Sequence, residues 1–183
     1  MALLAPRKNV EPAERKLVLF GLGSVVYGVA IERVREVVNP QPVIALPHAP
    51  PSIVGVTHHR GEVVPVVDLR HRFGLPAAAE HRRVKWIMLD VGSDGERPLA
   101  AIVDEVLVVF PTRDPLRPAP SLGGGEDVRG ILGVVSRPLP QKREQLVFVL
   151  DLARLRALVD PLVPATEALL GQGSGSGERA GQA

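Results

Sequence analysis

The stretch IVGVTHHRGEVVPVVDLRHRFGL, residues 53–75, decides how we expect the chain to fold. Its first two segments are rich in β-branched valine and flank Arg60-Gly61, a pair that suits a tight hairpin turn because glycine tolerates a positive φ. Asp68 follows the second segment and is placed to cap a short helix. Pro65 has no N–H to donate to a sheet ladder, so it predicts an edge position or a bulge for the second strand.

The same stretch suits a docking surface better than an active site. It contains no nucleophile beside a base and no glycine-rich loop for phosphate. It presents one long cation, Arg60, at the tip of a rigid turn, and arginine is enriched in protein interfaces. An exposed turn arginine without a function is an equally good interpretation. Glu36, within the segment 34–37, has the same two interpretations.

Composition limits the classes of protein to which the chain can belong. Its 183 residues suit one domain with tails, and 45% of them are apolar, although aromatic residues make up only 3%. We therefore expect a core of aliphatic side chains. There is no cysteine, which excludes disulfides and thiolate metal sites and favours a reducing compartment.

Charge and hydropathy exclude two further classes. The formal net charge of +2 arises from 22 basic and 20 acidic residues, interleaved rather than gathered into the basic face typical of nucleic-acid binders. No apolar run is long enough to span a membrane. The N-terminal segment does not have the form of a signal peptide. We expect a protein that neither inserts into a membrane nor binds nucleic acid.

Apolar patterns and turn signals predict two sets of about five short strands. We expect strands at 16–22, 25–30, the end of 31–38, both arms of 53–68, 84–91, 98–103, 104–110, 128–135 and 145–150. Asp151 is expected to cap a helix over 152–159. The proline-rich segments 39–51 and 111–127 read as loops. The predicted organisation is a flexible N-terminus (1–15), one domain (16–160), and a C-terminal extension with a flexible tail (161–183).

An internal repeat relates the two sets of strands. Val54-Gly55-Val56 corresponds to Leu132-Gly133-Val134, and segment 30–34 corresponds to 102–106. Small five-stranded units bury little on their own. We therefore predict an all-β fold in which two small barrels share one hydrophobic core, an arrangement that leaves few exposed sheet edges.

Residues that could perform chemistry have simpler structural interpretations. His58 and His59 are adjacent, and neighbours on a strand point to opposite faces, so we expect a polar turn flank and no zinc site. Asp68 and Asp151 each precede a short helix, which favours capping over paired acid–base catalysis. The glycines at 123–125 are followed by acidic residues, which would repel phosphate. The sequence therefore predicts no enzyme, no catalytic residue, no metal and no cofactor.

Beyond these patterns, a series of motifs resembles the CheW family of chemotaxis coupling proteins. The motifs are LVLFGLGSVVYGVAIERVREVV, LPHAPPSIVGVTHHRGEVVPVVDLRHRFGL, AAIVDEVLVV, LRPAP, ILGVV and LVFVLDLARL, and they cover about residues 15–160. The resemblance implies two five-stranded SH3-like β-barrels with short helices. It also implies a cytoplasmic, non-catalytic adaptor that couples the tip of a chemoreceptor (a methyl-accepting chemotaxis protein) to the regulatory domain of the histidine kinase CheA.

The resemblance also implies which residues contact each partner. Five would form or border the receptor-facing groove: Val34, Glu36, Ile53, Val56 and Arg60. Kinase contacts are expected at apolar barrel ends, with two candidates: Val103 and Val106. One departure concerns the pair before Arg60, since the family usually carries Asn-Leu where this chain has His58-His59. This change makes the groove more polar and sensitive to pH.

Two other classes of function compete with the adaptor. Small barrels often bind single-stranded nucleic acid, but the chain has few aromatic residues on which bases could stack. A salt-dependent response to single-stranded DNA would support that alternative. An enzyme is the other, and the sequence offers no catalytic constellation for it.

Overall fold

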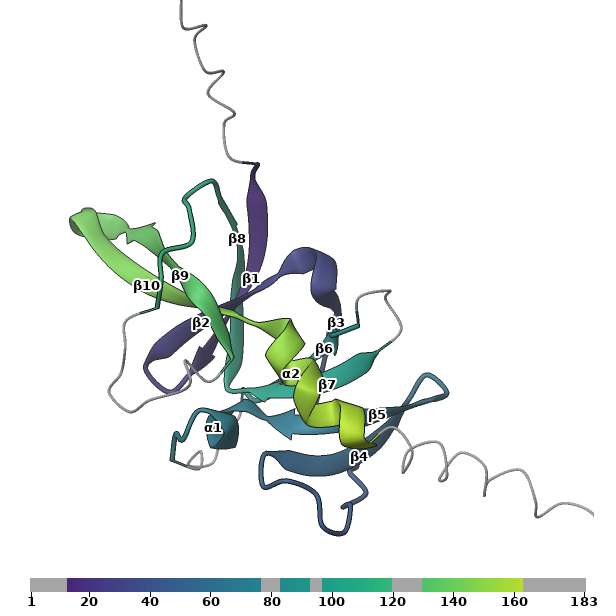
Figure 1. The fold of residues 1–183 in the computed structure, drawn as a ribbon. Coiled ribbons are helices and arrows are strands. Elements are labelled where there is room, and N and C mark those ends of the chain that lie inside the picture. The colour runs from purple at the N-terminus through teal and green to yellow at the C-terminus, as the bar shows by residue number, and fades with distance from the viewer. Residues whose placement is uncertain (1–12, 77–82, 93–96, 120–129, 163–183) are drawn as a thin grey trace, which may run out of the picture.

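The computed structural model describes residues 13–76, 83–92, 97–119 and 130–162, which form two β-sheets with short helices between some strands and after the last one (Figure 1). The strands are β1 (Arg15–Leu22), β2 (Val25–Ala30), β3 (Val34–Val38), β4 (Ile53–His59), β5 (Glu62–Asp68), β6 (Lys85–Asp90), β7 (Pro98–Val103), β8 (Glu105–Thr112), β9 (Ile131–Leu139) and β10 (Arg143–Leu150). One five-stranded sheet has the order β8-β1-β2-β10-β9, and the other has the order β3-β6-β7-β5-β4. The predicted all-β class is confirmed.

The two α-helices of the described residues, α1 (Leu69–Arg72) and α2 (Leu152–Val159), begin where the sequence predicted. The same residues also form three short 3-10 helices: η1 (Ile31–Arg33), η2 (Pro140–Lys142) and η3 (Asp160–Leu162). Asp68 accepts a hydrogen bond from the backbone N–H of Arg70 at 2.8 Å, and Asp151 accepts one from Ala153 at 3.0 Å. Both aspartates are therefore N-caps, as expected. None of the helices in the described ranges is long and apolar enough to cross a membrane.

The hairpin of β9 and β10 is longer than the sequence suggested. The predicted strands ended at 135 and restarted at 145, but pairing continues to Leu139 and Arg143. The turn places Gln141 and Lys142 at φ values of 63° and 58°, a conformation that glycine would have signalled and these residues do not. The predicted connector at 77–82, the glycines at 123–125 and most of both predicted tails lie outside the described residues.

The prediction that Pro65 marks an edge or a bulge is wrong, because β5 lies between β4 and β7. Pro65 sits opposite Val56, whose backbone N–H and C=O bond instead to Ile44 at 2.9 and 2.8 Å. The backbone nitrogen and carbonyl of Pro65 therefore point away from β4. On the other side, the parallel ladder with β7 begins only at Val66. The missing N–H removes no rung of either ladder, which is why an interior strand tolerates this proline.

The repeat is present in the fold, but each sheet combines strands from both halves of the chain. Strands β1 to β5 correspond to β6 to β10, and exchanging each strand for its counterpart converts one sheet order into the other. The parallel pairs also correspond, since β10 pairs with β2 and β5 pairs with β7. Neither half can complete a sheet alone, so the two repeats are interlocked.

Bulges recur at corresponding places. The pairing registers skip Arg35 in β3 and Leu107 in β8, which are counterparts in the repeat. They also skip Val54 in β4 and Leu132 in β9, again counterparts. A bulge residue has no partner across the ladder and can turn outward. This explains why three apolar residues of these strands are exposed: Val54, Leu107 and Leu132.

A bridging segment continues each sheet beyond its outer strand. Residues 41–44, after β3, lie along β4, where Ile44 pairs with Val56. After β8, Arg117 pairs in the same way with Val134 of β9. These are single bridges, and the strand order in each sheet is open. Strand pairing therefore gives two five-stranded sheets and does not by itself close them into barrels.

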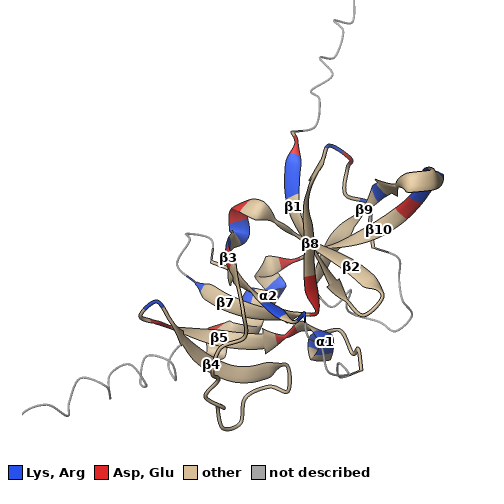
Figure 2. Ribbon diagram, turned by 180° about the vertical axis from the view of Figure 1, so that it is seen from behind, with Lys and Arg blue, Asp and Glu red and all other residues tan. Residues whose placement is uncertain are grey.

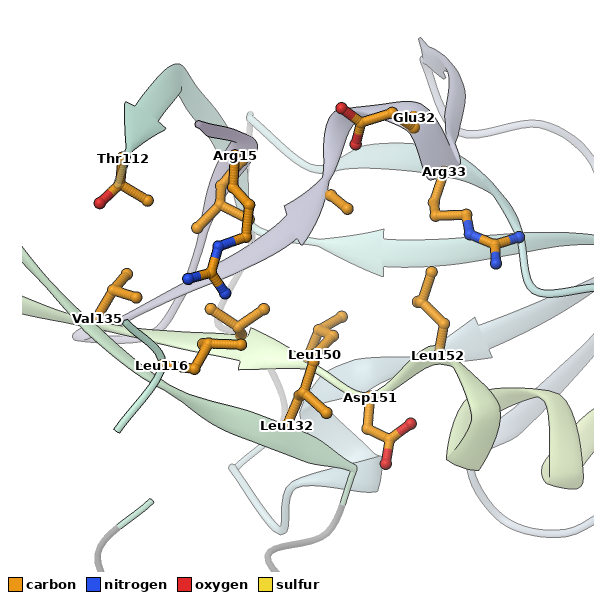
Figure 3. A pocket seen from close by; sticks show the side chains of 13 residues that line it. Arg15, Glu32, Arg33, Thr112, Leu116, Leu132, Val135, Leu150, Asp151 and Leu152 are labelled. Atoms are coloured by element: carbon orange, nitrogen blue, oxygen red, sulfur yellow. The ribbon is translucent and has the colours of Figure 1, made fainter. Parts of the chain in front are cut away.

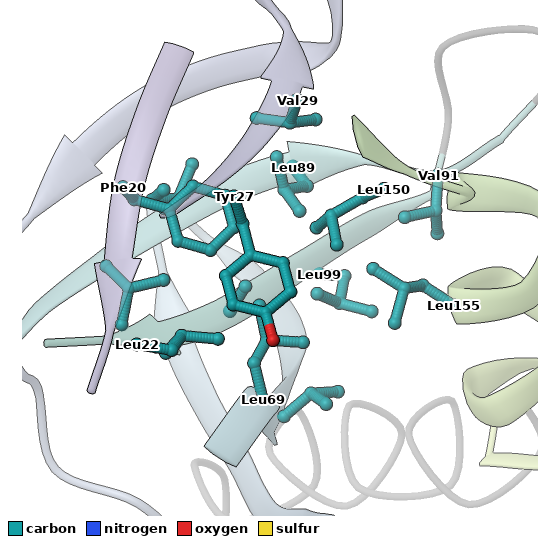
Figure 4. Close-up of a cluster of buried hydrophobic side chains, with 14 of the residues drawn as sticks. Phe20, Leu22, Tyr27, Val29, Leu69, Leu89, Val91, Leu99, Leu150 and Leu155 are labelled. Carbon is teal, nitrogen blue, oxygen red and sulfur yellow. The ribbon is translucent and has the colours of Figure 1, made fainter. Parts of the chain in front are cut away.

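One cluster of buried side chains joins the two sheets, and each sheet also has a smaller cluster of its own. Aromatic rings lie in the shared cluster (Figure 4): Tyr27 is 5.9 Å from Phe20, 4.9 Å from Phe73 and 6.0 Å from Phe148 between ring centroids. The core is mainly aliphatic, as expected, and these few rings lie within it. Trp86 is also buried. Rings placed in this way are not available to stack on bases, which weakens the nucleic-acid alternative.

Asp104, between β7 and β8, links the two sheets. Its carboxylate accepts a hydrogen bond at 2.6 Å from the backbone N–H of Gly23, in the β1–β2 turn. The same oxygen accepts a hydrogen bond from the guanidinium of Arg70, in α1, which also donates to the carbonyl of Pro76. A carboxylate that holds parts of both sheets helps to fix their relative position.

Candidate docking surface

The bulge in β3 brings two charged side chains to the tip of the β4–β5 hairpin. Because Arg35 is the extra residue, the alternation of side chains along β3 is broken at this point. Arg35 forms an ion pair with Glu62 at 3.0 Å, and Glu36 forms one with Arg60 at 2.9 Å. The hairpin tip is therefore tied to β3 by two neighbouring residues. In Figure 2 the tip and β3 carry both signs of charge.

The turn at this tip has the conformation that the sequence indicated. Arg60 and Gly61 have φ values of 50° and 86°, so both lie in the left-handed region, as in the two-residue turns that join twisted strands. This conformation costs a non-glycine residue about 1–2 kcal/mol. The side chain of Arg60 is 74% exposed and contacts the protein through its guanidinium.

Glu36 joins two side chains of the hairpin, one with each carboxylate oxygen. Its Oε1 lies 2.9 Å from Nε2 of His59, and its Oε2 accepts a hydrogen bond from Nη2 of Arg60. The other ring nitrogen of His59 lies 3.1 Å from the amide nitrogen of Gln41. The side chain of His59 is only 12% exposed, whereas His58 is exposed. The pair points to opposite sides, as predicted, but His59 is more than a polar turn flank.

The hydrogen bond from His59 is the largest influence on the pKa of the Glu36 carboxyl group. Together with the charge of Arg60, it lowers the pKa of Glu36 below its usual value, against the opposing effect of partial desolvation. Ionised Glu36 is therefore favoured in the folded protein. The stability that it contributes is present above its unfolded pKa and is lost as the pH falls through its folded pKa.

We expect the substitution Glu36→Gln to destabilise the fold at pH 7 and to have a smaller effect at acid pH, where the wild-type carboxyl group becomes neutral as well. Urea unfolding of both proteins at the two pH values measures the difference. Glu144→Gln, at an exposed position of β10, is the matched control and should show no such dependence. An equal loss of stability at both pH values would contradict the assigned role of the Glu36 charge.

An open cleft of about 250 Å³ lies elsewhere, where the first sheet meets η1 and α2 (Figure 3). Its lining is mainly apolar, and three of its four charged side chains bond within the described part of the protein, Glu32 being the exception. Arg15 donates to the carbonyl of Asp114, Arg33 donates to the carbonyl of Gly92, and Asp151 caps α2. Within the described ranges, no group of three histidine or acidic residues could hold a metal ion. The cleft does not bring acids and bases together.

A family model of the CheW-like domain matches residues 16–159. The chain belongs to the CheW family. The probable chemotaxis protein CheW of Rhizobium etli is 31% identical over 133 residues, covering 71% of this chain and 84% of that protein. Protein FrzA of Myxococcus xanthus is 35% identical over 150 residues, covering 79% and 91%. The crystal structure of the scaffolding protein TtCheW from Thermoanaerobacter tengcongensis matches with a TM-score of 0.64 at 25% identity, covering 80% of this chain and 90% of that one.

Membership of the CheW family confirms the function predicted from the sequence. The chain is a chemotaxis adaptor that couples chemoreceptors to the histidine kinase CheA. The CheW family is a family of scaffolds without catalysis, which agrees with the prediction that the chain is not an enzyme.

Only part of the predicted receptor-facing set lies at the surface of this CheW-family chain. Glu36 and Arg60 meet there, and Val34 is half-buried against the shared core. Ile53 and Val56 are only 6% and 1% exposed, and their place at the border of a receptor groove stays a prediction. A motif locates a strand, but it does not show which face of the strand is covered, and here both side chains face the interior.

The predicted kinase contacts divide in the same way. Val103 is fully buried in the shared core and presents no surface, whereas Val106 is half-buried. Beyond Val106, β8 exposes three consecutive apolar side chains that the sequence pattern does not distinguish from those of an ordinary strand: Leu107, Val108 and Val109. By the repeat, Val108 is the counterpart of Glu36. In this CheW-family fold, the place that a charged side chain occupies in the first half is therefore occupied by an exposed apolar side chain in the second.

Proposed function

We propose that this adaptor acts in the cytoplasm without catalysis and that its receptor-facing surface is centred on Glu36 and Arg60. The single observation that supports this assignment is the shared carboxylate of Glu36, which bonds to His59 and Arg60 at 2.9 Å each. The ion pair of Arg35 with Glu62 holds the other side of the same hairpin tip. An exposed cation on a braced turn is a fixed recognition point for acceptor groups on a receptor.

The proposed mechanism is differential binding. Arg60 and its neighbours would hold the receptor tip, and a separate surface would hold the regulatory domain of CheA. If the two states of a receptor differ in their contacts with this adaptor, the difference can bias the kinase between its own states. Small interfaces on separate surfaces keep each contact reversible.

We place the kinase contact at the apolar strip of β8, next to Val106, with Val103 supporting it from the core. Exposed apolar residues in a row are uncommon unless a partner covers them. We also propose that each sheet and its bridging segment form a barrel of the SH3-like type, which would make a stiff connection between the two contacts. The bridges of Ile44 to Val56 and of Arg117 to Val134 support this arrangement.

A co-sedimentation experiment tests the proposed function. Purified adaptor, a chemoreceptor in membranes and the regulatory domain of a CheA kinase, all encoded in the same genome, are mixed and centrifuged. We expect the kinase domain to sediment only when both the adaptor and the receptor are present. Membranes that lack receptor are the control. If the kinase domain remains in the supernatant in the complete mixture, the proposal fails.

A further inference from the structure

We propose that His59 is a positioning residue of the receptor-facing surface: it holds the carboxylate of Glu36, which in turn orients Arg60. This inference rests on the proposed function and adds a residue to the same surface. The geometry points to it because Oε1 of Glu36 bonds to His59 and Oε2 bonds to Arg60, both at 2.9 Å. Each oxygen of the carboxylate thus has its own partner.

The two contacts of Glu36 differ in burial. The side chain of Arg60 is 74% exposed, and an exposed ion pair orients a long side chain only where its partner is itself held in place. The side chain of His59 is 12% exposed and lies on the strand itself. The bond from His59 therefore fixes the carboxylate, and the fixed carboxylate then limits the orientations of Arg60.

His59 is itself held on its other side. Its Nδ1 lies 3.1 Å from the amide nitrogen and 3.2 Å from the amide oxygen of Gln41. The bridging segment that contains Gln41 is attached to β4, because Thr57 donates to the carbonyl of Pro42 at 2.8 Å. Both ring nitrogens therefore have partners on elements that are fixed relative to β4, and the imidazole has little freedom to rotate.

The surroundings of His59 are compatible with either protonation state. Glu36 faces it from β3, Gln41 faces it from the bridging segment, and Arg60 follows it in the turn. Glu62 lies across the ladder from it and is paired with Arg35. The neutral ring donates from Nε2 to Glu36 and accepts at Nδ1 from the amide of Gln41. The charged ring donates from both nitrogens, and the amide of Gln41 can turn to accept. The bond to Glu36 persists in both states.

Affinity measurements with matched variants test this role. The probe is the purified cytoplasmic hairpin of a chemoreceptor from the same genome, and the dissociation constant is measured for each variant. We expect His59→Leu to weaken binding about 5- to 10-fold, because a hydrogen bond to a charged group is lost. His59→Gln, which keeps a donor, should stay within about twofold of the wild type. His58→Leu, at the exposed neighbour, should leave the affinity unchanged.

A double-mutant cycle separates positioning from general damage to the hairpin. In an Arg60→Ala background, His59→Leu should cause little further loss, because the side chain that it positions is absent. If His59→Leu weakens binding by the same factor in both backgrounds, or if His58→Leu is equally harmful, the positioning role is wrong.

A spectroscopic measurement tests the contact without any receptor. Nitrogen-15 NMR of the histidine rings at pH 8 should show the tautomer of His59 that is protonated at Nε2, and this preference should weaken in Glu36→Ala. If the tautomer of His59 is unaffected by Glu36→Ala, the inference fails even where receptor binding is normal. If the wild type shows the contact but does not bind the receptor hairpin, the proposed function fails and the contact stands.

Discussion

Replacing Arg60 with glutamate is expected to abolish co-sedimentation with receptor-containing membranes while leaving the fold and kinase binding intact. The side chain is 74% exposed, so no core packing is lost. The variant removes the cation at the hairpin tip and places a second carboxylate beside Glu36. Like charges placed at an interface cost several kcal/mol, so we expect the affinity for receptor to fall about 100-fold or more.

A charge exchange distinguishes receptor recognition from internal pairing. The double variant Glu36→Arg with Arg60→Glu can restore the ion pair between β3 and the hairpin tip but does not restore the cation at the tip. If Arg60 contacts the receptor, the double variant should remain unable to bind. Thermal unfolding and binding to the kinase domain check that each variant is folded. Unchanged recruitment of Arg60→Glu by receptor membranes would contradict the proposed surface.

Local signals along the chain predicted local structure well. Arg60-Gly61 predicted the turn, because a two-residue hairpin requires left-handed conformations there. Asp68 and Asp151 predicted the starts of α1 and α2, because a capping side chain needs only the backbone N–H groups that follow it. These features depend on residues within one or two positions of each other, and the chain specifies them without reference to the rest of the fold.

Features that depend on distant segments were not predicted. The buried positions of Ile53, Val56 and Val103 follow from which face of each strand is covered by another part of the chain. The contact of His59 with Glu36 depends on a bulge in β3, which shifts the register by one residue. A bulge has no reliable sequence signal unless glycine marks it. The Glu36 and Arg60 site could therefore be named from the family resemblance, but its internal bonding could not.

The interlocked repeat explains why two glycines occupy corresponding places. A Cβ added to Gly55 would lie 2.2 Å from the carbonyl oxygen of Ile44, and one added to Gly133 would lie 2.8 Å from that of Arg117. Ile44 and Arg117 are the residues through which the two bridging segments pair with β4 and β9. In both halves, glycine allows a second backbone to approach the strand closely. The repeated motif that the sequence showed is therefore a requirement of the bridge.

Gly55→Ala is expected to destabilise the protein by about 3 kcal/mol, because the added methyl group meets backbone that cannot move without breaking the bridge. Gly55 also has a φ of 151°, which an L-residue rarely adopts. Gly23→Ala is the matched control: its φ is 60°, and nothing lies within 4 Å of the added Cβ, so only the conformational cost of about 1 kcal/mol applies. Urea unfolding measures both variants. Equal losses for Gly55→Ala and Gly23→Ala would show that the approach of Ile44 to β4 does not constrain this position, and the bridge would then not explain the repeated glycine.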